Sequence, residues 1–78
     1  MDPIMETLQE IFTIHFDVEE TAISDQTSAQ DVEGWDSFAH VSLMSDVEER
    51  FNVSFTGSEI VAFKTVGDIV DTIRRKVA

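Results

Sequence analysis

The chain has 78 residues, of which 42% are hydrophobic, and its formal net charge is −11. This length fits a single domain, residues 1–78, whose core buries roughly 60% of the surface that the unfolded chain exposes. The absence of cysteine excludes disulfides and thiolate metal sites, and sixteen acidic residues against five basic ones would repel nucleic-acid phosphates and anionic lipid head groups while attracting basic proteins. We therefore expect basic protein partners, no metal and no nucleic acid.

The first 14 residues bear on location as well as on fold. They contain Asp2, Glu6 and Glu10 but no basic residue, a composition that argues against a secretory signal peptide. No apolar run approaches the ~20 residues that a membrane-spanning helix needs. The sequence thus predicts a cytoplasmic monomer without a membrane span.

The first helix is predicted over residues 3–16. Pro3 suits the first turn of a helix, and the three acids Asp2, Glu6 and Glu10 lie on the side opposite the apolar stripe. The apolar stripe follows at spacings of three and four. Its members are Ile4, Leu8, Ile11, Phe12 and His15 or Phe16.

The segment from Asp17 to Trp35 is predicted to be a loop. It is rich in Ser, Thr, Asp and Gln and holds only scattered apolar residues. Connections of this length are uncommon in a compact domain unless they span the fold or carry function. We expect Ile23 and Val32 to fasten the loop to the core and Trp35 to anchor its end.

A second helix is predicted from Asp36 or Ser37, either of which can cap it, to about residue 51. At ~100° per residue, one sector of this helix forms a core-facing stripe. The stripe consists of His40, Leu43, Met44, Val47 and Phe51. Phe38 and Val41 lie on a neighbouring face beside Ser37, where they are either covered by another segment or exposed as a docking surface.

Two capping boxes predict the remaining helices. Thr56–Glu59 opens a short helix that ends near residue 63, and Thr65–Asp68 opens the last helix, which ends near residue 77. The stretch Val53–Phe55 alone has the alternation of a strand. The predicted fold class is all-α: a small up-down helical bundle of three main helices plus one short helix, with a long loop between the first two.

Ser37 is the residue whose placement indicates function, and three interpretations compete for it. A hydrolase nucleophile would need a G-x-S-x-G setting and a base, but the motif is absent and His40 belongs to the core stripe. A plain N-cap serine is the commonest alternative. A covalent phosphate ester would also be stabilised there, because the first-turn N–H groups and the helix dipole favour an anion.

A calcium loop of the EF-hand type is excluded because the acids around Asp31 have the wrong spacing.

Three segments, in order, resemble the acyl carrier protein family, with its Asp-Ser-Leu attachment motif, acidic second helix and Thr-Val-x-Asp start of the last helix. They run from Gly34 to Ile73, about half of the chain. The matching residues are Asp36-Ser37-Phe38, Val41-x-Leu43-Met44-x-x-Val47-Glu48-Glu49-x-Phe51 and Phe63-x-Thr65-Val66-Gly67-Asp68-Ile69-Val70-x-x-Ile73.

The resemblance implies a cofactor and a non-catalytic role. Ser37 would bear 4′-phosphopantetheine as a phosphodiester, transferred from coenzyme A by a phosphopantetheinyl transferase. Asp36 would help to position the metal-bound coenzyme during that transfer. The thiol of the arm would hold an acyl or aminoacyl group as a thioester, so the chain would carry cargo and catalyse nothing.

The resemblance also implies a docking surface for partner enzymes. Phe38, Val41, Glu48 and Glu49 stand at positions that would contact the transferase, an acyl or aminoacyl synthetase or transferase, and downstream enzymes with basic surfaces.

Departures from the family pattern bear on the pathway. Phe38 replaces leucine, and Ala39, His40 and Ser42 stand where carriers of fatty acid synthesis often have acids or a threonine. Together with Trp35, they favour a freestanding carrier of a specialised pathway, such as polyketide, nonribosomal peptide, aminoacyl or modified-sugar assembly. Two alternatives stay open: a fatty-acid-synthesis carrier, and an unmodified acidic helical module for protein interaction.

Overall fold

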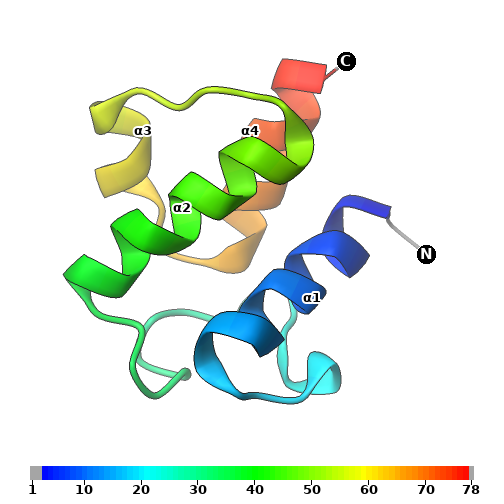
Figure 1. The fold of residues 1–78 in the computed structure, drawn as a ribbon, viewed down its shortest axis with the longest axis vertical. Coiled ribbons are helices and arrows are strands. Elements are labelled where there is room, and N and C mark those ends of the chain that lie inside the picture. Colours follow the sequence, from blue (N-terminus) through cyan, green and yellow to red (C-terminus); the bar gives the residue numbers. More distant parts are fainter. Residues whose placement is uncertain (1–2, 78) are drawn as a thin grey trace.

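Figure 1 shows a computed structural model of the chain, which describes residues 3–77. The helices are α1 (Pro3–Phe16), a short 3-10 helix η1 (Glu20–Ala22), α2 (Ser37–Phe51), α3 (Gly57–Ala62) and α4 (Val66–Val77). The all-α prediction is confirmed, with helix ends close to those expected. Within the described part, Val53–Phe55 forms no strand, and the only β pairing is a single bridge between Ser28 and Thr65. Asp2, predicted on the acidic side of α1, lies outside the described residues.

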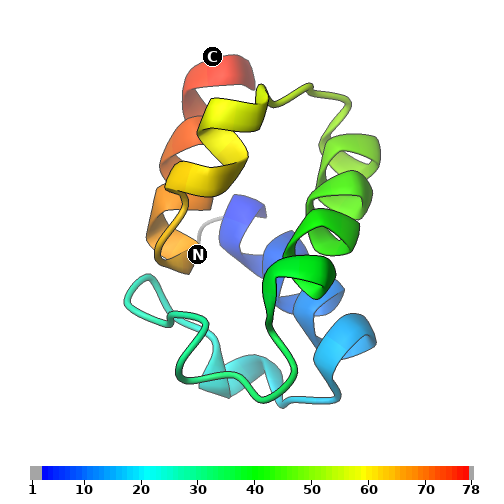
Figure 2. The same ribbon diagram turned by 90° about the vertical axis from the view of Figure 1, so that its left-hand side faces the viewer.

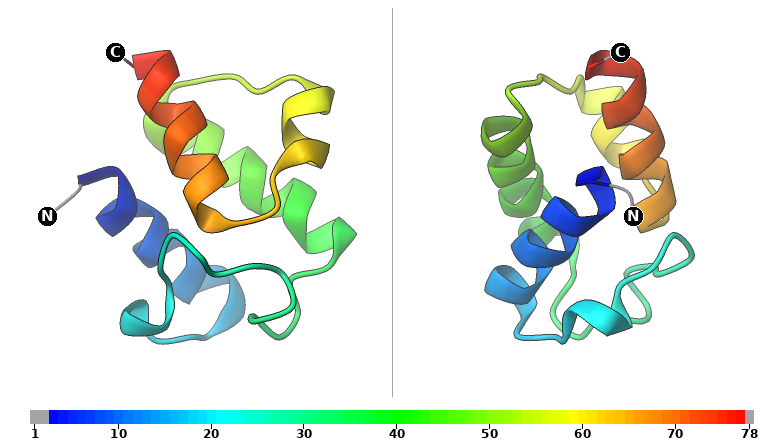
Figure 3. Two further views of the ribbon diagram at one scale, coloured as in Figure 1. Left: turned by 180° about the vertical axis from the view of Figure 1, so that it is seen from behind. Right: turned by 90° about the vertical axis from the view of Figure 1, so that its right-hand side faces the viewer.

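The four α-helices alternate in direction along the chain, as an up-down bundle requires (Figure 1). Seen from the side in Figure 2, α2 lies opposite the pair formed by α3 and α4, and α1 passes between them. The long connection of residues 17–36 runs beneath the bundle and reaches the start of α4 (Figure 3). None of the helices in residues 3–77 is long and apolar enough to cross a membrane.

One face of each long helix forms the core. The buried apolar residues of the helices are Leu8, Ile11 and Phe12 of α1, Leu43, Met44 and Val47 of α2, and Val66, Ile69, Val70 and Ile73 of α4. Phe51 and His40, predicted in the core stripe of α2, are only partly buried. Burial of these side chains is the main contribution to folding free energy in a domain of this size.

The long loop is held to the core by apolar side chains, as predicted. Ile23 and Val32 are 2% and 4% exposed, and Trp35 meets Phe12 edge to face with ring centroids 5.0 Å apart. The short helix η1 was not predicted, because a three-residue 3-10 turn has no periodicity to detect.

Backbone hydrogen bonds also fasten the loop to the start of α4. The N–H of Val66 donates to the carbonyl of Thr27, and the N–H of Gly67 donates to the carbonyl of Asp25, both at 2.9 Å. A Cβ atom at position 67 would lie 2.8 Å from the Asp25 oxygen, so this close approach requires glycine. The loop is therefore a fixed part of the fold, and its end at Trp35 is well placed to orient the start of α2.

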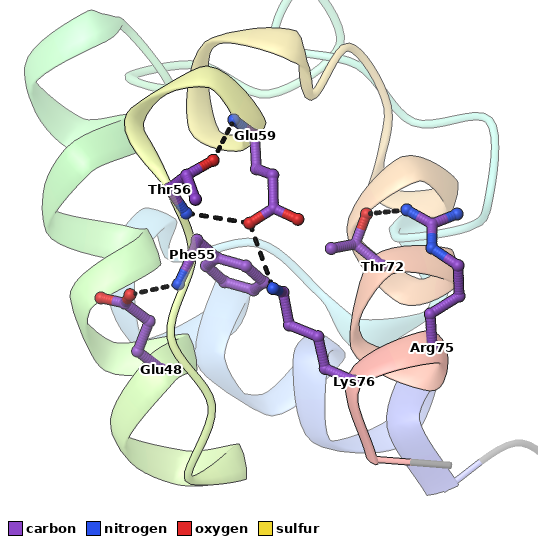
Figure 4. Close-up of polar contacts among 7 residues, drawn as sticks. All are labelled: Glu48, Phe55, Thr56, Glu59, Thr72, Arg75 and Lys76. Carbon is purple, nitrogen blue, oxygen red and sulfur yellow. Dashed lines mark hydrogen bonds and ion pairs between the residues drawn. The ribbon is translucent and has the colours of Figure 1, made fainter.

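A set of polar contacts fixes the connection between α2 and α3 (Figure 4). Asn52 ends α2 in the left-handed conformation, with φ 56°. A carboxylate oxygen of Glu48 then accepts a hydrogen bond from the N–H of Phe55 at 2.7 Å. The C-terminal end of α2 is thus tied to the segment that follows it.

The predicted capping box of α3 is confirmed. The Thr56 hydroxyl accepts from the Glu59 N–H, and the Glu59 carboxylate accepts from the Thr56 N–H. The same carboxylate pairs with Lys76 of α4 at 3.2 Å (Figure 4). The Thr56 hydrogen bond and, next, Lys76 hold the pKa of Glu59 below its ordinary value. The second predicted box also forms, between Thr65 and Asp68.

Candidate functional site

The start of α2 is set by a turn at Gly34. This residue has φ +90°, a conformation that side chains with a Cβ rarely adopt. The Asp36 N–H donates to the Gly34 carbonyl at 3.0 Å, which closes the turn. As a result Trp35 points into the core, at 6% exposure, whereas Asp36 and Ser37 are exposed.

Asp36, and not Ser37, caps the helix. Its Oδ1 accepts a hydrogen bond from the Ala39 N–H at 2.8 Å, and its backbone is extended. Ser37 is therefore the first residue within α2. The Ser37 hydroxyl is not used as the cap, and it makes no hydrogen bond within residues 3–77. Because Asp36 provides the cap, the N-cap role does not explain a serine at position 37. Within the described part of the chain, the Ser37 oxygen has no hydrogen bond to lose on modification.

The surroundings of Ser37 fit a covalently attached phosphodiester. The side chain stands in the first turn of a 15-residue helix, where unpaired N–H groups and the helix dipole stabilise an anion. Ser37 and both of its neighbours in the chain are exposed. The site can therefore hold a bulky phosphate group without rearrangement of the core.

An open groove of about 410 Å³ begins beside Ser37 and runs between α2 and α3. Its apolar lining comes from Val41 of α2, from Ile60 and Val61 of α3, and from Trp35 and Phe63; the other lining residues are Ala29, Asp36, Ser37, His40 and Lys64. A hydrophobic group attached near Ser37 would find its nearest apolar surface here.

The predicted docking residues divide into two kinds. Phe38 and Val41 are 86% and 61% exposed, so no other segment covers them, and Val61 of α3 adds a third apolar side chain at 74% exposure. Glu49 is exposed, whereas Glu48 is partly buried and holds the Phe55 N–H. The sequence did not indicate Val61, because a six-residue helix is too short for its outer face to be recognised from periodicity.

The chain is similar to known proteins over nearly its whole length. A family model for the phosphopantetheine attachment site matches residues 2–73. The acyl carrier protein of Caulobacter vibrioides strain NA1000 / CB15N is 31% identical over 78 residues, which is 100% of each chain. The chain belongs to the acyl carrier protein family. The acyl carrier protein of Thermotoga maritima is 29% identical over 76 residues, 97% of this chain and 94% of its relative.

Solved structures of the family share the fold. The holo acyl carrier protein of Geobacter metallireducens superposes with a TM-score of 0.85 at 32% identity, over 97% of this chain and 87% of that one. The acyl carrier protein of Enterococcus faecalis gives a TM-score of 0.78 at 25% identity, over 94% and 92% of the two chains. The chain is thus a non-catalytic acyl carrier with a covalently attached 4′-phosphopantetheine arm. That group supplies a terminal thiol, which the chain itself lacks since it has no cysteine.

Proposed function

We propose that the Ser37 hydroxyl is the attachment point of the arm and that the loaded protein presents acyl or aminoacyl thioesters to partner enzymes. The observation that carries this proposal is the free, exposed Ser37 oxygen in the first turn of α2, with the capping role taken by Asp36. The Ser37 oxygen gains the bond to phosphorus and loses its proton, while the nucleotide part of coenzyme A departs. Asp36, one residue away and exposed, would help to position the metal-bound coenzyme.

Intact-protein mass spectrometry tests the attachment site. The apo protein is incubated with coenzyme A, Mg²⁺ and a promiscuous phosphopantetheinyl transferase, and should gain one phosphopantetheine. Ser37→Ala should gain none. Ser42→Ala and Ser45→Ala are matched controls, because both are exposed serines of the same helix and should be labelled like the wild type. Labelling of the Ser37→Ala variant would contradict the assignment.

We propose that the transferase and later partners dock over Phe38, Val41 and Glu49, with a smaller part for Glu48. Any enzyme that acts on the Ser37 oxygen must approach the exposed side chain of the next residue, Phe38. The high negative charge favours partners with basic surfaces. An unmodified interaction module would need the same surface, but membership of the family and its arm weigh against that alternative.

We also propose that the partners belong to a specialised assembly pathway and not to fatty acid synthesis. Ala39 and Ser42 leave the first turns of α2 without acids, and the exposed Phe38 and Val41 make the surface around Ser37 apolar. A partner that places basic side chains against these first turns would gain little there, and charge attraction would come from acids further along α2, such as Glu49. The cytoplasmic location and monomeric state stay predictions.

Enzymes of fatty acid synthesis provide the test of the pathway. The holo protein should be a poor substrate for a malonyl transferase of that pathway, and the double variant Ala39→Asp/Ser42→Glu should be a better one. Both substituted positions lie on α2 outside the buried core, so the fold should be retained. Efficient malonyl transfer to the wild type would contradict the proposal and favour the fatty-acid-synthesis alternative.

A further inference from the structure

His40 joins three segments of the molecule at the buried side of the groove. Its Nδ1 lies 2.9 Å from the indole Nε1 of Trp35, at the end of the long loop. Its Nε2 lies 2.8 Å from the carbonyl oxygen of Ile60, in α3. One side chain of α2 therefore holds both the loop and α3 in place.

These two partners fix the protonation of the ring. The indole N–H of Trp35 can only donate, so Nδ1 of His40 must accept and carries no proton. The Ile60 carbonyl can only accept, so Nε2 must carry the proton and donate it. The neutral Nε2–H tautomer is the one form of His40 that satisfies both hydrogen bonds.

Ring packing gives the same side chain a second constraint. The His40 ring meets the ring of Phe63 edge-on, with centroids 6.3 Å apart at 75°, and the hydrogen-bonded Trp35 ring has its centroid 5.8 Å away at 30°. Leu43 and Met44, about one turn further along α2, are fully buried. His40, Trp35 and Phe63 thus form a barrier between the groove and the core.

We propose that His40 determines cargo specificity by keeping this groove shallow, an inference that rests on the proposed attachment at Ser37. A short or polar cargo stays in the groove or in solvent. A long alkyl chain could be buried fully only if α3 separated from α2. That movement would break the hydrogen bond between His40 Nε2–H and the Ile60 carbonyl at a partly buried position, which is costly. The carrier is therefore suited to short acyl or aminoacyl groups.

Two variants separate the hydrogen bonds of His40. In His40→Asn, the amide oxygen can replace Nδ1 as the acceptor for Trp35, but the side chain is too short to reach Ile60. In His40→Gln, the amide nitrogen can replace Nε2 as the donor to Ile60. The Asn variant should therefore loosen α3, and the Gln variant should keep it in place.

Cleavage of the thioester by hydroxylamine measures how well the cargo is sheltered. The wild type and both variants are loaded with acetyl or decanoyl arms from the corresponding coenzyme A derivatives. In the wild type and in His40→Gln, the two thioesters should be cleaved at rates within about twofold of each other, whereas in His40→Asn the decanoyl thioester should be cleaved about fivefold more slowly, the factor that one hydrogen bond is worth. Acetyl cleavage should be the same in all three proteins.

Strong protection of the decanoyl thioester in the wild type, or identical protection in all three proteins, overturns the inference. Two measurements on the wild type test it even where a variant fails to fold. The ¹⁵N spectrum of the His40 ring should show a protonated Nε2 and an unprotonated Nδ1, and an unprotonated Nε2 would contradict the geometry. Decanoyl loading should leave the amide signals of Leu43 and Met44 unshifted. If mass spectrometry shows no arm at Ser37, the attachment proposal fails instead, separately from the ring measurement.

Discussion

The two ends of α2 differ in how their side chains are used. At the C-terminal end, Glu48 holds the Phe55 N–H, Arg50 pairs with Glu10 of α1 at 3.1 Å, and Val47 is fully buried. At the N-terminal end, Phe38 and Val41 are exposed and the Ser37 hydroxyl has no hydrogen bond within the described residues. One helix thus serves as a structural element at one end and carries the proposed docking surface at the other.

The difference teaches where substitutions should affect stability and where they should affect transfer. Side chains with fixed partners contribute to the free energy of unfolding, and exposed apolar side chains without partners contribute little to it. An apolar surface next to the proposed modification site costs solubility, so its presence is better explained by binding. The ends of α2 can therefore be compared by pairs of matched variants.

The largest effect on stability should come from Val47, and Val41 on the same helix provides the matched comparison. Val47→Ala removes buried methyl groups from the core and should lower the free energy of unfolding by about 2 kcal/mol, since both transfer and cavity terms are lost. For a domain of this size the Tm should fall by roughly 8–16 °C. Val41, at 61% exposure, should change stability by less than about 0.5 kcal/mol when replaced by alanine.

The rate of arm transfer should show the reverse order. Val41→Ala should slow modification by a phosphopantetheinyl transferase about fivefold, which corresponds to roughly 1 kcal/mol of interface contact. Val47→Ala should leave this rate unchanged at a temperature where it is folded. Calorimetry measures the free energy of unfolding, and mass spectrometry of samples quenched at successive times measures the rate of arm transfer. Equal effects of both variants on both quantities would show that the ends of α2 do not have separate roles.

Two neighbouring glutamates give a smaller and sharper contrast. Glu48→Ala removes the acceptor of the Phe55 N–H and should lower the free energy of unfolding by about 1 kcal/mol, or roughly 4–8 °C in Tm. Glu49 is exposed, and Glu49→Ala should stay within about 0.5 kcal/mol of the wild type. Transfer from enzymes with basic surfaces should instead fall more for Glu49→Ala, with a dependence on salt. A stability loss in Glu49→Ala alone would invert our assignment of the two roles.

The sequence was sufficient to predict features that depend on a repeating pattern or on residues close together in the chain. Helical periodicity identified α1 and α4, and the Thr56–Glu59 box marked the start of α3, because both signals are local. The placement of Ser37 at a loop–helix boundary was likewise visible. The family resemblance supplied the arm, which no spacing of residues in the chain could have indicated.

Features that depend on contacts between distant segments could not be predicted in this way. Asp36 and Ser37 are both good caps, and only the geometry of the Gly34 turn selects Asp36. The contact of His40 with Ile60 spans 20 residues, and whether Val41 is covered depends on where the short α3 packs. Helical periodicity placed His40 in a hydrophobic stripe, but it could not show that both ring nitrogens have partners.

The smallest predicted effect concerns Glu59, which caps α3 and pairs with Lys76 of α4. Its folded-state pKa lies below the ordinary value, chiefly because of the Thr56 N–H and then Lys76. A carboxyl group of this kind stabilises the fold above its unfolded pKa of ~4.3, and that contribution is lost as the pH falls through the lowered folded pKa. The Tm difference between the wild type and Glu59→Gln should therefore be largest near neutral pH and disappear in strong acid. Glu33→Gln, at an exposed loop position, is the matched control for the change in net charge. If the Tm difference between the two proteins grew as the pH fell, the Glu59 charge would destabilise the α3–α4 contact. The contacts among Thr56, Glu59 and Lys76 would then stabilise the fold only through neutral hydrogen bonds.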